Sequence, residues 1–165
     1  MLFSNPGAVG RWLRVGHELR GQAVSAVWAQ PDNPLVVLAA CGGGGLWRSG
    51  DGGQRWERAL ETPTTAAGCG AALVALGGKA PVLLLAAGEG IWRSDDDGAT
   101  WMAAAVDTPW TGGVSTIVPA SYHIDTAFAG SGAGQVYLST DRGRSWQMLK
   151  DGLPPIRAIS AARLA

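Results

Sequence analysis

The sequence predicts an all-β protein made of repeated units, and three observations carry that prediction. A motif of eight residues, S-x-D-x-G-x-x-W, occurs three times, with its serines 45 residues apart at Ser49, Ser94 and Ser139. Self-similarity at a period of 20–50 residues is typical of repeat architectures. Short apolar runs precede each motif and alternate with a period of two, as strands do. The sequence contains no convincing 3.6-residue apolar stripe, so we expect no substantial helix.

Each copy of the motif is expected to form a tight turn between two strands. Ser and Asp side chains bond backbone N–H groups in short loops, and Gly supplies a positive φ. The Trp starts the next strand and offers its indole N–H to a nearby acceptor. The motif residues are Ser49, Asp51, Gly53, Trp56, Ser94, Asp96, Gly98, Trp101, Ser139, Asp141, Gly143 and Trp146.

Four strands, labelled a to d in chain order, are expected in each unit. Strand a is represented by 24–27 and 114–117, and strand b by the apolar runs 35–40, 82–87 and 126–129. Strand c comprises 46–49, 91–94 and 136–139 and leads into the motif, after which strand d starts at the motif Trp. One position of strand c holds Arg48, Arg93 and Leu138. We expect these arginines to cover the strand with their alkyl stems and to pair with a nearby acid.

The three motifs resemble the Asp-box, or BNR, repeat. That repeat is found in sialidases, sortilin-type receptor ectodomains, xyloglucan-degrading glycoside hydrolases and photosystem II assembly factors. The resemblance implies a β-propeller of four-stranded antiparallel blades, in which the box joins strands c and d and is structural rather than catalytic. We refer to residues 49–56, 94–101 and 139–146 as box turns 1, 2 and 3.

The chain is expected to form a single partial propeller domain over residues 1–165, with about three full blades and a part-blade at each end. Residues 1–20 are interpreted as the end of a degenerate blade, because Trp12 matches the motif Trp although no Asp survives before it. Blade 1 is assigned to 21–62, blade 2 to 63–108 and blade 3 to 109–153. Residues 154–165 are assigned as the first strand of a composite blade.

Two open ends are a physical problem, since a propeller is stable as a closed ring and exposed edges invite pairing. Two copies joined end to end would form a ring of about eight blades. One copy closing alone as four small blades, or a different protein completing the ring, would also solve it. We favour the homodimer, because cyclic twofold pairing is the commonest assembly. A fragment or an engineered segment is a further alternative.

Composition excludes several classes of function. The formal net charge is +0, from 13 basic and 13 acidic residues, and no basic patch is present, so nucleic acid is not expected as a partner. The longest apolar run, near 81–87, is far too short to span a membrane. The N-terminus lacks the pattern of a signal peptide, which makes the cytoplasm the default location.

No cofactor or metal is expected. The two histidines, His17 and His123, are far apart in the repeat order, so no cluster with ligand spacing exists. The run 95–97 of three aspartates is interpreted as turn carboxylates around the box Asp. Cys41 and Cys69 could be bridged, but buried free thiols are favoured because Cys behaves as a small hydrophobe.

The resemblance implies that the d-to-a and b-to-c connections share one face, where ligands bind. The acids expected there are Glu61, Glu89, Asp107 and Asp151. Glycoside hydrolysis needs two carboxylates about 5–10 Å apart. Three of these acids recur at one repeat position, which favours a turn role. Glu89 and Asp107 are the first pair to test.

An aromatic residue, Trp110, is expected on the same face. It either stacks a sugar or anchors a peptide, or it packs between blades, and the second is favoured because Trp is strongly buried on average. A sialidase site is not supported, because by resemblance it would use a tyrosine nucleophile on the ligand face. Of the two tyrosines in the sequence, Tyr137 replaces a strand-c Trp and Tyr122 lies in a turn on the box side.

The predicted function is therefore a non-enzymatic binding or scaffold propeller that presents loops to a protein or glycan partner and closes its ring by self-association. A glycoside hydrolase or sialidase-like propeller is one alternative. A protein-binding module like the photosystem assembly factors is the other.

Overall fold

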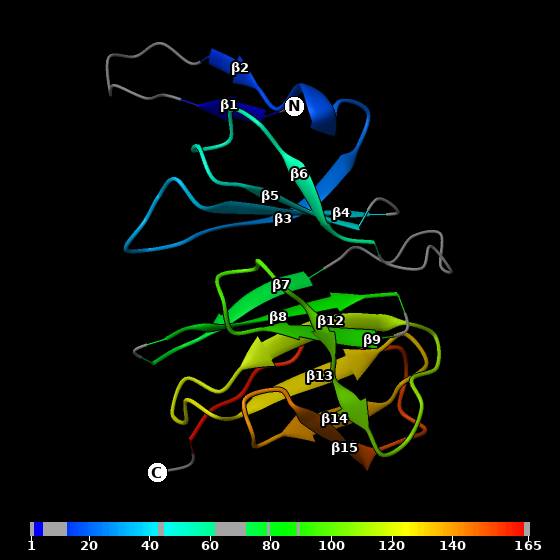
Figure 1. Cartoon of the computed structure of the whole chain (residues 1–165). Helices are drawn as coiled ribbons and strands as arrows, with labels where there is room; N and C mark the ends of the chain where they lie inside the picture. Colours follow the sequence, from blue (N-terminus) through cyan, green and yellow to red (C-terminus); the bar gives the residue numbers. More distant parts are fainter. Residues whose placement is uncertain are drawn as a thin grey trace.

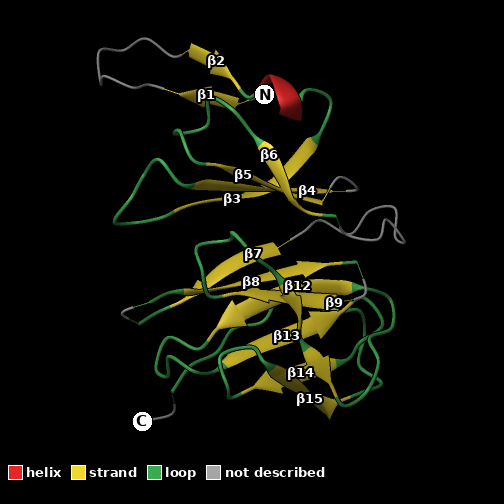
Figure 2. Ribbon diagram, in the orientation of Figure 1, coloured by secondary structure: helices red, strands yellow, loops and turns green. Residues whose placement is uncertain are grey.

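The protein is an all-β chain of antiparallel sheets, which confirms the predicted fold class. The computed structural model describes residues 2–4, 13–42, 45–61, 72–78, 80–88 and 90–163. Among these residues the only helical element is one 3-10 turn, η1 (His17–Leu19) (Figure 2). The described residues contain no helix that is long and apolar enough to cross a membrane.

Within each four-stranded unit, neighbouring strands in the sheet are also neighbours in the sequence. The N-terminal hairpin is β1 (Leu2–Ser4) with β2 (Leu13–Val15). The first four-stranded sheet, in blade 1, holds β3 (Ala23–Ala29), β4 (Val37–Gly42), β5 (Gly45–Ser49) and β6 (Glu57–Leu60). Blade 2 contributes β7 (Ala72–Leu76), β8 (Val82–Ala87), β9 (Gly90–Ser94) and β10 (Met102–Ala103). Blade 3 contributes β12 (Val114–Pro119), β13 (Ala127–Ser131), β14 (Val136–Ser139) and β15 (Ser145–Lys150).

The sheets stack face to face, from the β1–β2 hairpin at the top of Figure 1 to blade 3 at the bottom. A buried cluster fills each junction. Leu38 and Leu83 belong to the cluster between blades 1 and 2, and Leu84 and Tyr137 to the cluster between blades 2 and 3. The third cluster lies on the other face of blade 1 and includes Leu19 and Trp56.

Strand β8 lies in the middle of the stack and is covered on both faces, which accounts for its continuous apolar sequence. All six of its residues, Val82–Ala87, are buried. Leu83 and Leu85 face blade 1, whereas Val82 and Leu84 face blade 3, as the alternation of side chains along a strand requires. Because both faces are covered, no polar residue is accommodated.

The outer strand of blade 2 departs from the expected meander. After β10 the chain leaves its own sheet at Ala104, and β11 (Ala105–Val106) pairs in parallel with β15 of blade 3. The Ala105 N–H donates to the Arg144 carbonyl at 2.9 Å, and the Asp107 N–H donates to the Trp146 carbonyl at 3.1 Å. Blade 3 is therefore part of a five-stranded sheet.

The C-terminal segment 156–163 takes the place of a first strand without forming one. The Ile156 N–H donates to the Ser131 carbonyl at 3.1 Å, at the end of β13. A similar bond marks the start of β12, where the Val114 N–H donates to the Gly88 carbonyl, which follows β8, at 2.9 Å. Residues 154–163, within the first strand predicted over 154–165, form no strand and pair with none in the described residues.

Candidate functional site

The Ser and Gly of each box turn hold the turn closed through the same hydrogen bond. The Ser49 hydroxyl accepts the N–H of Gly53 at 2.9 Å and donates to an Asp51 carboxylate oxygen at 2.8 Å. Box turns 2 and 3 repeat both contacts within 0.1 Å. The Ser side chain thus links the end of strand c to the glycine at the far side of the turn.

The box Asp binds the N–H groups that begin strand d. Asp51 Oδ1 accepts from the N–H groups of Gln54 and Arg55, each at 2.9 Å. In box turn 3, Asp141 accepts from both the N–H and the hydroxyl of Ser145, at 3.0 and 2.6 Å. The Asp51 pKa lies below its usual value, mainly because of the hydrogen bond from Arg55 N–H. Burial alone would raise the pKa of Asp141, but the bonds from Ser145 and Ser139 outweigh it and lower it.

This arrangement predicts loss of stability in acid. Each box Asp, including Asp96, has a folded-state pKa lower than its unfolded value, so its contribution is complete above the ordinary aspartate pKa of about 3.9 and disappears as the pH falls through the lower folded value. Urea unfolding followed by Trp fluorescence should give a constant midpoint from pH 7 to 5 and a falling one from pH 4 to 2.5. In the Asp141→Asn variant the fall should be shallower; an unchanged slope would contradict this account.

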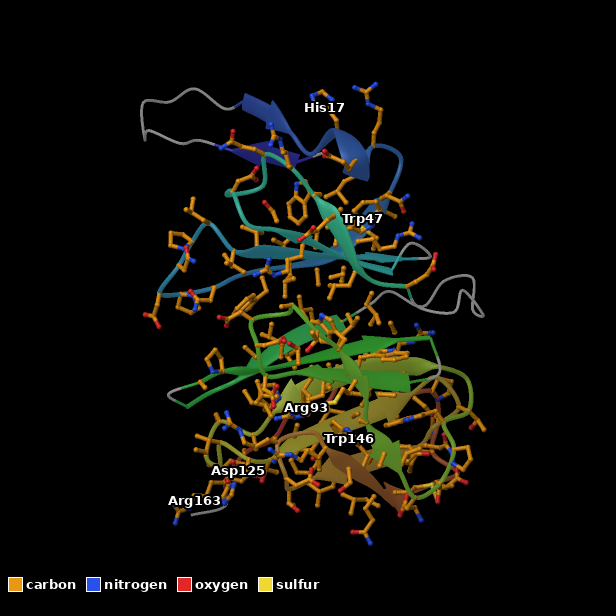
Figure 3. All side chains as sticks on the ribbon, viewed as in Figure 1. His17, Trp47, Arg93, Asp125, Trp146 and Arg163 are labelled. Atoms are coloured by element: carbon orange, nitrogen blue, oxygen red, sulfur yellow. The ribbon has the colours of Figure 1, made fainter. Side chains whose placement is uncertain are left out.

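Two of the three box tryptophans close the turn with their indole groups. Trp56 Nε1 donates to the Gly53 carbonyl at 2.9 Å, and Trp101 Nε1 donates to the Gly98 carbonyl at 3.1 Å. Trp146 differs: its Nε1 is buried, and no hydrogen-bond partner for it exists among the described residues. Its ring packs edge-on against Trp110, with centroids 6.3 Å apart. Figure 3 labels Trp146 in the lower part of the stack.

Box turns 2 and 3 also dock on the blade that precedes them. A strand-c arginine donates from its Nε to the carbonyl of the residue before the box glycine, as Arg48 does to Asp97 at 3.4 Å and Arg93 does to Arg142 at 3.0 Å. We refer to these two contacts as the arginine latches. Arg93 is 5% exposed and also pairs with Asp95 at 2.9 Å, as the sequence predicts for an arginine at this position. The latch itself was not foreseen, because it joins residues 49 positions apart.

Side chains reinforce the same junctions. The Arg142 guanidinium donates to the carbonyls of Gly77 and Ala80 in the a-to-b turn of blade 2, at 3.0 and 2.8 Å. In box turn 2, Asp97 accepts from the Gln30 side chain at 3.4 Å. The aspartate run 95–97 is therefore distributed among three separate contacts. The described residues contain no group of His, Cys, Asp and Glu that could hold a metal ion.

The residues predicted on the opposite, ligand-binding face are engaged in packing. Trp110 is 8% exposed and lies against Tyr137 with ring centroids 3.8 Å apart. The Tyr137 hydroxyl donates to the carbonyls of Thr108 and Pro109, and its pKa is raised by burial and by the charges of Asp107 and Asp151. A tyrosine in this strand-c position therefore ties down the connection that carries Trp110.

Each candidate acid in the described part of the chain has a partner of its own. The Asp107 carboxylate accepts the Met148 N–H at 3.0 Å and so fastens the crossing of β11 to β15. Glu61 pairs with Arg58 at 2.6 Å, with both side chains exposed. Asp151 accepts from the N–H of Gly152. Glu89 lies outside the described residues.

Cys41, the cysteine within the described residues, is not placed for thiolate chemistry. Cys41 is a free, buried thiol, and burial raises its pKa, which disfavours the reactive thiolate. Cys69 lies outside the described residues.

A depression of about 250 Å³ beside box turn 1 is lined by Arg48, Gly50, Asp51, Arg55, Trp56 and Glu57, a set with both charge signs. It favours no single ligand class.

Comparison with known proteins places this geometry in a structural class. Neither a protein-family model nor a curated protein matches the chain. Among solved structures, an ancestral GH74 enzyme is similar at 23% identity and a TM-score of 0.62, over 75% of this chain and 18% of that one. A GH74 enzyme of Niastella koreensis is similar at 21% identity and a TM-score of 0.56, over 78% of this chain and 21% of that one.

A third similar structure is YCF48 from Cyanidioschyzon merolae, at 17% identity and a TM-score of 0.54, over 78% of this chain and 37% of that one. These proteins are β-propellers, and at such identities the likeness establishes the fold alone. The chain thus has the architecture of a β-propeller and spans well under half the length of each of these three relatives.

Proposed function

We propose that the protein is a non-enzymatic Asp-box propeller that serves as a binding or scaffold module and completes its ring by self-association. The observation that carries the proposal is the state of the two ends of the stack. The β1–β2 hairpin stands beyond blade 1 as a sheet of two strands, and the segment 156–163 lies beyond blade 3 in the place of a first strand. In this proposal the hairpin supplies strands c and d of a blade and the segment supplies strand a.

The described residues also support a role without catalysis. Asp107 and Trp110, the candidates on the ligand-binding face, are committed to a backbone N–H and to an aromatic cluster. A hydrolytic site needs two carboxylates facing a common space. The likeness to GH74 enzymes keeps glycoside hydrolysis as the alternative function, and the likeness to YCF48 keeps a protein-binding one. A protein or glycan partner would meet the exposed loops of the rims.

Self-association predicts the mass in solution. Light scattering on a sizing column should give twice the 17.0 kDa of the chain. The dimer should dissociate on dilution with little loss of β-sheet signal in circular dichroism, because the sheets of blades 1, 2 and 3 each lie within one copy. A mass of 17 kDa at every concentration would contradict self-association and leave closure within one copy or by a different protein.

A further inference from the structure

The junction between blades 1 and 2 and the junction between blades 2 and 3 use the same pair of contacts. Comparing these contacts with the residues on the outer face of blade 3 indicates what kind of surface would pack there. At each junction a leucine of strand b packs directly on the box glycine of the next blade. A Cβ added to Gly98 would lie 2.6 Å from the Leu38 side chain, and one added to Gly143 would lie 2.3 Å from the Leu84 side chain. A strand-c arginine then forms the latch to the same turn. Leucine and arginine together hold the following blade.

Blade 3 presents the same two positions with different residues. Phe128 stands in β13 at the place of Leu38 and Leu84, and Leu138 stands in β14 at the place of Arg48 and Arg93. Their neighbours Ala127, Ala129 and Tyr137 are buried against blade 2, so Phe128 and Leu138 project from the opposite face, where both are only half-buried. This face is apolar where the other junctions carry a positive charge.

The inner part of that face is already occupied. Ile156 packs on Gly130, where an added Cβ would lie 2.4 Å from its side chain, and its carbonyl accepts from the Ser115 hydroxyl. The segment 156–163 thus lies in the position of strand a, with no partner strand among the described residues. Phe128 and Leu138 remain beside it, in the region that strands c and d of a following blade would cover.

We propose that the outer face of blade 3, defined by Phe128 and Leu138, receives the β1–β2 hairpin of a second copy of this chain. The hairpin corresponds to strands c and d of a blade, and it pairs with no other strand in the described residues. A two-stranded hairpin alone is marginally stable in water, so it gains from a second packing surface. This inference rests on the self-association proposed above and names its surface.

The match extends to the missing latch. Residues 5–12, between β1 and β2, contain no Asp, whereas each of the three box motifs carries one. Leu138, on the facing surface, has no guanidinium group with which to form an arginine latch. The arginine is therefore absent where the sequence of the partner departs from the motif. A head-to-tail contact of this kind, repeated once, closes two copies into a ring when each copy spans half of that ring.

Cysteine cross-linking tests the proposed contact in the full chain. In a Cys41→Ala, Cys69→Ser background, Leu138→Cys is combined with Leu2→Cys in one variant and with Phe3→Cys in another, because successive positions of a strand lie on opposite faces and the two variants sample both. A short bismaleimide should link one of the two pairs between copies and give a dimer on a denaturing gel. Glu57→Cys, on the outer strand of blade 1, replaces the β1 cysteine in the control and should give no dimer above background.

A second measurement uses charge. Leu138→Asp should weaken dimerisation at least tenfold, whereas Met102→Asp, at a residue 59% exposed on blade 2, should leave it unchanged. A native mass of two chains without either cross-link, or with Leu138→Asp inert, would overturn this surface while self-association stands. A monomeric mass for the unmodified chain would overturn both proposals. Circular dichroism of each variant checks that the sheets are intact.

Discussion

Replacing Trp110 with alanine should reduce the free energy of unfolding by about 3–5 kcal/mol, the range for large buried aromatic side chains. The ring is 8% exposed and contacts both Tyr137 and Trp146. Its loss leaves a cavity at the junction of blades 2 and 3, where the surrounding side chains are already packed. Urea unfolding followed by far-ultraviolet circular dichroism measures the change.

Two variants separate this packing role from a role in binding. Trp110→Phe keeps an aromatic ring and should cost less than half as much as Trp110→Ala. Tyr122→Ala removes an aromatic side chain that is 44% exposed and should change stability by no more than about 0.5 kcal/mol. A Trp110→Ala protein as stable as the parent would instead place the ring at a surface, where it would be free to anchor a ligand.

Replacing Gly143 with alanine should reduce stability by about 2–5 kcal/mol, from two separate penalties. Its φ of 78° is unfavourable for any residue with a Cβ, and the Cβ would lie 2.3 Å from the buried Leu84 side chain. Gly152→Ala provides a matched control, because its φ is 73° with no atom within 4 Å of the added Cβ.

The difference between the two glycine variants isolates the cost of crowding at the blade junction. Gly152→Ala should lose only the conformational part, about 1–2 kcal/mol. The remainder in Gly143→Ala should shrink when Leu84 is changed to Ala in the same chain, since the space is then relieved. Equal losses for both glycines would mean that Leu84 moves aside freely and does not position box turn 3.

The residues that recur in the sequence identified most of the fold. The three-fold motif predicted turns with Ser, Asp and Gly in fixed roles, and those hydrogen bonds are present in each copy. The apolar run 82–87 predicted a strand, which is β8. These features were accessible because they depend on short-range hydrogen bonding and on the alternation of side chains.

Features that depend on a neighbouring blade were not accessible. The recurrence of Arg48 and Arg93 is visible in the sequence, but the carbonyls they bind are main-chain atoms, which carry no sequence signal. The same is true of β11, since two residues joining another sheet have no pattern of their own. For Trp110 the sequence favoured packing between blades, and the ring is 8% exposed; what the sequence did not indicate is that Tyr137 holds its connection in place.

The crossing of β11 to β15 has a consequence for how the molecule unfolds. Repeat proteins behave as chains of units coupled to their neighbours, and the coupling sets which units open together. Blades 2 and 3 share main-chain hydrogen bonds of a sheet, in addition to a buried cluster. Blades 1 and 2 are joined in the described residues by no shared sheet. Hydrogen exchange should therefore divide the chain unequally, with blades 2 and 3 opening as one cooperative unit and blade 1 opening at a lower free energy.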